Sequence, residues 1–236
     1  PANSFNTDTL IQTTSEDIFH VPYTANDATP TAFVTETDLE NAMRTAGAAS
    51  ALTNASDRDT LDDVNITDAT VQTDGDLILA HGFGNSSALL TSAFSGTLLR
   101  VTETGTVSIF RSAANIKTAA GYLPSVNIGN IGVATMPAGI AGGSVLIVVT
   151  LTSDEVNSPG FVAVVSGDGA TQRLVATRLQ LQGALSGAAA TGAVTGGTGP
   201  GANTLFAFDA KFTFPVDANG DLYFHRQGTS NNDEAN

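Results

Sequence analysis

Residues 144–182 read SVLIVVTLT-SDEVNSPG-FVAVVS-GDGA-TQRLVATRLQLQ, and this stretch decides the fold. Val145–Leu151 is a short, continuous run of β-branched and other apolar residues, which fits a buried strand. Pro159-Gly160 and Asp168-Gly169 are turn signals on either side of a second apolar run, Phe161–Val165. The third run alternates, so we expect one of its faces to be partly wet. The stretch therefore predicts three consecutive antiparallel strands.

Three more hairpins are predicted elsewhere in the chain. Residues 70–80 turn at Asp74-Gly75, and residues 97–110 turn at Glu103-Thr104-Gly105. Residues 205–226 turn at Asp217-Ala218-Asn219-Gly220, after alternating phenylalanines that need a core to face: Phe206, Phe208, Phe212 and Phe214. A short helix is suggested at residues 112–120 within an otherwise Gly- and Pro-punctuated region. The fold class predicted is mainly β, an antiparallel β-sandwich or jelly-roll-like body.

The front of the chain differs from this body in charge and pattern. Residues 1–76 hold 14 of the 23 acidic residues and two of the nine basic ones. We expect residues 1–68 to be an acidic N-terminal arm, residues 69–230 the β-sandwich body, and residues 231–236 a polar tail. Within the arm, residues 18–21 fit a short strand. An extended arm of this composition needs a neighbour to order it.

One helix is predicted in the arm, near residues 38–46. Thr37 and Glu40 have the spacing of a capping box, and Gly47 is a natural C-cap. The helix is too short to stand alone, so it must pack either on the β body or on another subunit. Its apolar stripe is the tentative partner-binding surface: Leu39, Ala42, Met43 and Ala46.

Composition narrows the classes of function. The chain has 236 residues, a net charge of −14, and neither Cys nor Trp. Without Cys there is no disulfide framework and no thiolate metal site. The acidic balance disfavours direct nucleic-acid binding, which needs a basic surface. The chain has no run of about 18 apolar residues, so no membrane span is expected. No signal peptide is expected at its start either, so we expect synthesis in the cytoplasm.

The sequence offers no specific catalytic, cofactor or metal motif, and we assign no residue to such a role. Asp217–Asp221 contains part of a calcium loop but lacks its remaining ligands, and a turn explains it more simply. The same holds for the acidic pairs Asp62-Asp63 and Asp74/Asp76. The histidines are His20, His81 and His225. The segment around Ser86 comes nearest to the G-x-S-x-G nucleophile elbow, but it lacks the second glycine of that motif.

The whole chain resembles virion structural proteins of tailed bacteriophages. The residues that carry this are the start Pro1-Ala2-Asn3-Ser4, the hairpin TLLRVTETGTVSIF at residues 97–110, and FDAKFTFPVDANGDLYF at residues 208–224. The resemblance is architectural and compositional, so it assigns no individual residues. It implies a non-enzymatic capsid decoration, head-fibre or tail-associated component located in the virion. Its partners would be copies of itself and other virion proteins such as the capsid shell, with no nucleic acid or membrane bound directly.

Two other classes of function remain open. A receptor- or glycan-binding adhesin module would use the loops at residues 82–87 and 183–202, the second of which is dominated by Gly and Ala. A hydrolase would depend on Ser86 or His81. A reproducible glycan ligand would favour the first alternative, and loss of turnover on substituting Ser86 or His81 would favour the second.

Overall fold

The computed structural model describes residues 9–12, 17–21, 31–45, 64, 66–81, 95–123, 126, 128–137, 142–151, 160–177, 180, 219 and 221. Its elements in chain order are β1 (Thr9–Gln12), β2 (Ile18–Val21), β3 (Thr31–Val34), α1 (Glu36–Thr45), β4 (Ile66–Val71), β5 (Leu77–His81), β6 (Leu98–Val101), β7 (Val107–Arg111), α3 (Ala113–Ala119), β8 (Ile128–Thr135), β9 (Val145–Leu151), β10 (Gly160–Val165) and β11 (Gln172–Thr177).

The central stretch forms the strands predicted for it. β9, β10 and β11 pair antiparallel, and β8 adds a fourth strand, so that this sheet has the order β11-β10-β9-β8. We call it sheet C. β9 and β10 are buried on both faces along their described residues, as expected for continuous apolar runs. β11 ends at Thr177, whose amide donates to Gln180 Oε1 at 2.8 Å.

A second four-stranded antiparallel sheet, sheet B, has the order β4-β5-β6-β7 and contains both hairpins predicted between residues 70 and 110. The turns of the β4–β5, β6–β7 and β10–β11 hairpins share one hydrogen-bond pattern. In each, a glycine with positive φ donates its amide to the carbonyl three residues earlier: Gly75 to Gln72, Gly105 to Thr102, and Gly169 to Ser166.

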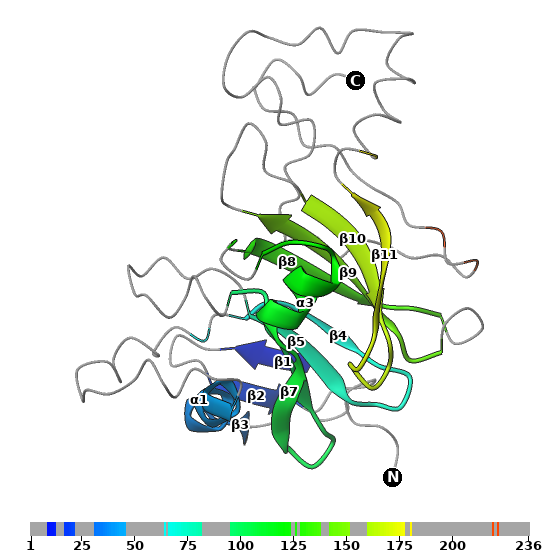
Figure 1. The fold of residues 1–236 in the computed structure, drawn as a ribbon. Coiled ribbons are helices and arrows are strands. Elements are labelled where there is room, and N and C mark those ends of the chain that lie inside the picture. The colour runs from blue at the N-terminus through cyan, green and yellow to red at the C-terminus, as the bar shows by residue number, and fades with distance from the viewer. Residues whose placement is uncertain are drawn as a thin grey trace, which may run out of the picture.

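Sheets B and C pack face to face as an antiparallel β-sandwich, which confirms the predicted fold class (Figure 1). Side chains from alternate positions of both sheets form the core between them. They include Ile78, Ala80, Leu98 and Phe110 from sheet B, and Val133, Ile147, Val149, Phe161 and Ala163 from sheet C. α3 adds Ile116 to this core, and Tyr122 stacks on Phe161 with the ring centroids 5.6 Å apart.

The N-terminal elements cover the opposite face of sheet B. β1, β2 and β3 form a three-stranded antiparallel sheet, sheet A, and α1 follows directly after β3. A second core lies between this layer and sheet B, formed by Ile18, Val34, Leu39, Ala42, Met43, Val64, Leu77, Leu79, Leu99 and Val101. Sheet B is therefore the middle layer of the described part, with a core on each face (Figure 1).

β4 and β8 meet along a seam where side chains replace the main-chain ladder. Val133 N donates to Asp68 Oδ2 at 2.8 Å, Thr135 N donates to Thr70 Oγ1 at 3.0 Å, and Thr135 Oγ1 donates to Val71 O at 2.7 Å. The partner numbers rise together, so the two strands run parallel. At this seam the two sheets of the sandwich are joined through Asp and Thr side chains.

The far edges of the two sheets are joined by Arg111 at the end of β7. Its Nη1 donates to the carbonyls of Gly169 and Ala170 at 2.7 and 3.0 Å, and its Nε donates to Gln172 Oε1 at 3.1 Å. Gln172 Nε2 in turn donates to Ile116 O on α3 at 3.0 Å. This Arg111 clasp fastens β7, the β10–β11 turn and α3 to one another.

The structure corrects several boundaries. The helix of the arm is α1, Glu36–Thr45, and the residues with the capping-box contacts are Thr35 and Asp38 rather than Thr37 and Glu40. Both pairs have the same spacing, but β3 ends at Val34, and Thr35 is therefore the residue at the entry to the helix. β4 begins at Ile66, ahead of the expected boundary at residue 69.

Two smaller elements are confirmed where the sequence predicts them. The strand at residues 18–21 is β2, and the helix at 112–120 is α3, with Ser112 as its N-cap. β8 was not predicted. The Gly/Ala-rich residues 183–202, the hairpin at 205–226 apart from Asn219 and Asp221, and the tail at 231–236 lie outside the described residues.

Candidate functional site

The N-terminus of α1 is fixed by contacts with the chain just before it. Asp38 Oδ2 accepts hydrogen bonds from Thr35 N at 3.1 Å and from Thr35 Oγ1 at 2.7 Å. Asp17, just before β2, accepts from Glu36 N at 2.9 Å through Oδ1. Carboxylates at this position satisfy free amides and oppose the positive end of the helix dipole. The direction of α1 is therefore set by sheet A.

The predicted partner-binding stripe lies against the chain's own sheet B. Leu39, Ala42 and Met43 are buried in the second core, with 0, 6 and 2% of their surface exposed, and Ala46 lies outside the described residues. Packing on the β body was one of the two arrangements expected for this helix. A partner that used these three side chains would first have to separate α1 from sheet B.

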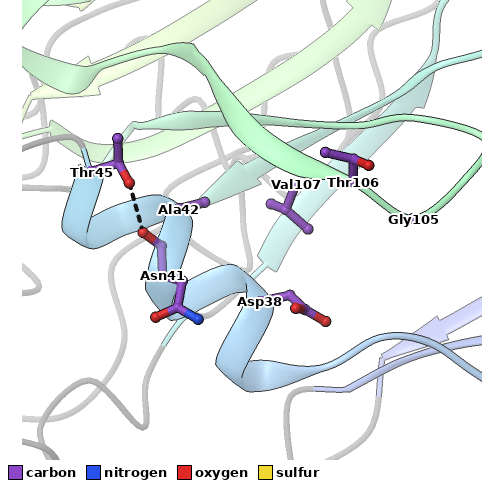
Figure 2. A pocket seen from close by; sticks show the side chains of 7 residues that line it. All are labelled: Asp38, Asn41, Ala42, Thr45, Gly105, Thr106 and Val107. Carbon is purple, nitrogen blue, oxygen red and sulfur yellow. Dashed lines mark hydrogen bonds between the residues drawn. The ribbon is translucent and has the colours of Figure 1, made fainter.

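The polar side of α1 next to this buried stripe borders an open cleft of about 420 Å³, and Ala42 belongs to both (Figure 2). Its lining comes from α1 and from the β6–β7 turn with the start of β7: Asp38, Asn41, Ala42, Thr45, Gly105, Thr106 and Val107. In Figure 2 the Val107 side chain lies opposite Ala42 across the cleft, with Asp38 and Asn41 on the helix side. Helix and turn are distant in sequence and meet only in the fold.

The chemistry of this cleft is that of hydrogen-bond acceptors beside a small apolar wall. The described hydrogen bonds of Asp38 are accepted on Oδ2, which leaves the acceptor capacity of Oδ1 for a ligand. Thr45 Oγ1 donates to Asn41 O at 3.0 Å, so its lone pairs remain available. Among the seven lining residues one carboxylate is present, and an acid–base pair of carboxylates is not. The cleft suits binding of a donor-rich or cationic group.

Asp74 and Asp76, one of the acidic pairs considered as metal ligands, have a structural partner, whereas Asp62, Asp63 and Asp217 lie outside the described residues. Arg100 on β6 donates through Nη2 to Asp74 Oδ2 at 3.0 Å and through Nε to Asp76 Oδ2. Both carboxylates thereby hold the β4–β5 turn against β6. Within the described residues there is no group of three or more His, Cys, Asp or Glu that could hold a metal ion.

The residues of the hydrolase alternative are not brought together in the part of the chain that can be described. His81, at the end of β5, has 3% of its surface exposed and lies within the fold. Ser86, His225 and the side chain of His20 lie outside the described residues. A substrate would have no direct access to the His81 ring.

Two buried cations near α3 were missed by sequence reasoning. Arg111 and Lys117 have 8 and 2% of their surface exposed, and burial lowers the pKa of both side chains. The hydrogen bonds of Arg111 are to carbonyl and amide oxygens, which identifies its role as the structural clasp. The sequence around Arg111 and Lys117 does not indicate that these side chains are buried. The contacts of Arg111, for example, are with the β10–β11 turn of sheet C, which is distant in sequence.

Asp68, on the seam, is a partly buried carboxylate. Burial raises its pKa above the ordinary value, although the amides of Val133 and Ala69 donate to it and act in the opposite direction. Asp168 shows the reverse behaviour. Hydrogen bonds from Ser166 Oγ and Ala170 N lower the pKa of this exposed carboxyl group in the β10–β11 turn.

Neither the described helices nor comparisons with known proteins indicate a function. No described helix is long and apolar enough to cross a bilayer. Comparisons with family models, with curated proteins and with solved structures returned no match. The proposed function therefore rests on the fold, the cleft and the charge distribution.

Proposed function

We propose that this chain is a non-enzymatic structural protein of a virion, a capsid decoration, head-fibre or tail-associated component that assembles through its N-terminal segment. The observation that carries the proposal is the way α1 is held. Its apolar stripe is buried on sheet B, and its polar stripe borders an open cleft on a rigid sandwich. Such a helix presents a surface in a fixed position, as an assembly contact requires.

The charge distribution supports an assembly role for this segment. α1 has Glu36 and Asp38 in its first turn, and most of the chain's acidic residues lie before residue 77. A surface of this sign attracts a basic or donor-rich partner and accelerates their encounter. The partners proposed are further copies of this chain and other virion proteins such as the capsid shell.

Several charged side chains of the described part have structural partners. Asp74 and Asp76 bind Arg100, Arg111 forms the clasp, and Asp68 spans the seam. Side chains committed in this way are poor candidates for acid–base catalysis, which needs a group free to exchange protons with a substrate. This favours a structural role over the hydrolase alternative.

The proposal is tested by adding charge to the outward side of α1. Thr37 and Asn41 are exposed, so Thr37→Arg and Asn41→Arg leave the second core unchanged. We expect each variant to reduce co-sedimentation with virions at least tenfold, because a repulsive charge is placed at the contact. Thr118→Arg, at an exposed position on α3, is the matched control and is expected to co-sediment normally. Normal co-sedimentation of both α1 variants would rule out assembly through this face.

A second function, glycan binding, is favoured by the composition of the cleft. Carboxylate, amide and hydroxyl groups from Asp38, Asn41 and Thr106 are suited to sugar hydroxyls, although the lining has no aromatic ring. A reproducible glycan-array ligand that is lost in Asn41→Arg, together with unaffected assembly, would favour this alternative.

A further inference from the structure

We infer that the occupant of the α1 cleft is the exposed edge of strand β11 from a second copy of this chain. The inference rests on the proposed assembly function and names the partner of its surface. It joins two features of opposite chemistry that lie on different sides of one molecule. One is the acceptor-rich cleft beside α1, and the other is the short edge segment Arg173-Leu174-Val175, which we call the β11 edge.

The β11 edge combines a cation with exposed apolar side chains. Among the described strands β11 pairs only with β10, so it forms the margin of sheet C. Leu174 and Val175 have 37 and 47% of their surface exposed, and Arg173 beside them is exposed as well. Exposed strand margins pair readily with other chains, and Arg is enriched among the residues that contribute most to binding energy at interfaces.

Arg173 is distinguished from the other cations whose side chains are described. Arg100 is engaged with Asp74 and Asp76, and Arg111 and Lys117 are buried. Among the cations whose side chains are described, Arg173 is therefore the exposed one without such a role, in a protein with a net charge of −14. Charge complementarity between this residue and the acidic N-terminal face is the argument for a second copy.

The cleft is complementary to this segment in chemistry. A guanidinium group presents a planar fork of donors that matches a carboxylate and a neighbouring carbonyl oxygen. Asp38 Oδ1 and the Asn41 side-chain amide supply such acceptors, and Val107 and Ala42 supply an apolar wall for Leu174 or Val175. The cleft is open, so an extended strand margin can reach it.

The two surfaces cannot satisfy each other within one copy. α1 packs on one face of sheet B and β11 belongs to sheet C on the other face, so sheet B lies between them, with β7 between α1 and β11 in Figure 1. Contact between them is therefore intermolecular and head-to-tail. Repetition of a head-to-tail contact gives a ring when the rotation closes and a filament when it does not. Both outcomes are forms in which a virion component can be built.

The test measures self-association of the purified full-length chain by light scattering over a range of concentrations. We expect the wild-type chain to associate, and added salt to weaken this association. Arg173→Asp is expected to raise the dissociation constant at least tenfold, and Asn41→Arg to do the same. The double variant Arg173→Asp/Asn41→Arg is expected to recover part of the association, because the guanidinium introduced at position 41 can pair with the carboxylate introduced at position 173, although Asp38 remains in the cleft. Thr118→Arg, the matched control, is expected to associate like the wild type.

The possible results separate self-association from virion binding. A monomeric wild-type chain, or single variants that associate as tightly as the wild type, would overturn the inference. Failure of the double variant to recover, with far-UV circular dichroism showing it folded, would also count against it. If the chain alone is monomeric but still co-sediments with virions in an α1-dependent way, the proposed function stands and this inference falls. If neither self-association nor virion binding occurs, both fall.

Discussion

A single missing methyl group determines how closely the β10–β11 turn approaches β7. Gly169 has a φ of +74°, and a Cβ atom placed on it would overlap the carbonyl oxygen of Phe110. That backbone cannot retreat easily, because Arg111 next to it is bonded to Gly169 and Ala170. Glycine is required at this position for two separate reasons, its dihedral angle and the close approach.

The two reasons can be separated with Gly121, which has a φ of +85° and no neighbouring atom within 4 Å of the position that a Cβ atom would take. Gly121→Ala is expected to lower the free energy of unfolding by about 1 kcal/mol, the cost of a positive φ for alanine. Gly169→Ala is expected to lose clearly more, about 3 kcal/mol, because the clash adds to that cost. Urea unfolding of both variants measures the difference. Equal losses would show that the turn relaxes without penalty.

At the scale of elements, the chain joins its two main sheets with side chains where a continuous sheet would use its backbone. The seam depends on Asp68 and on threonines of β4 and β8. Short polar side chains can accept from and donate to a neighbouring backbone at close range. The seam thus links sheet B to sheet C, and it places the titratable carboxyl group of Asp68 between them.

The pH dependence of stability should reveal this group. Because burial raises the pKa of Asp68 in the folded state, its contribution to stability is greatest below the unfolded pKa, about 4. That contribution is lost as the pH rises through the higher folded pKa. We therefore expect the wild-type protein to lose unfolding free energy relative to Asp68→Asn as the pH rises from 3.5 to 7.

Asp168 provides a control with the opposite sign. Its pKa is lowered in the folded state, so its contribution is present above the unfolded pKa and is lost as the pH falls through the folded pKa. Urea titrations of Asp168→Asn at the same pH values should therefore show a trend opposite to that of Asp68→Asn. Parallel trends would mean that the burial of Asp68 does not govern its protonation.

The elements also show what can be predicted from sequence. β9 and β10 were predictable because they are almost entirely apolar and rich in β-branched residues, and Asp74-Gly75 marked the β4–β5 turn. β8 has the sequence IGNIGVAT, in which two glycines and an asparagine hide the strand pattern. Its stability comes from pairing with β9 and from the seam, so the pattern alone gives no signal. The cleft was missed for a similar reason, since α1 and the β6–β7 turn meet only through the second core.

At the scale of the whole molecule, the sandwich is held at one margin by the seam and at the other by the Arg111 clasp. Arg111→Met keeps much of the volume but leaves the carbonyls of Gly169 and Ala170 without this donor. We expect the free energy of unfolding to fall by about 2 to 4 kcal/mol, the range for buried acceptors that lose a charged partner. The substitution should also accelerate amide hydrogen exchange more in β10 and β11 than in β5 and β6.

Arg111→Lys is the informative companion variant. Lysine keeps the charge but cannot present the fork that reaches Gly169, Ala170 and Gln172 together. Its stability is expected to lie near that of Arg111→Met, well below the wild type. A fully stable lysine variant would show that charge alone, and not the shape of the guanidinium group, holds this margin.

The side-chain seam has a consequence for how the chain reaches its folded state. The hairpins of each sheet bring together residues that are close in sequence, whereas Thr70 and Thr135 in the seam are separated by 65 positions. Closing a longer loop costs more chain entropy, and few main-chain bonds are gained there in return. We therefore expect each four-stranded meander to take shape early and the seam to close late. Nascent chains would expose the future interior of the sandwich until β8 has been synthesised and has found β4.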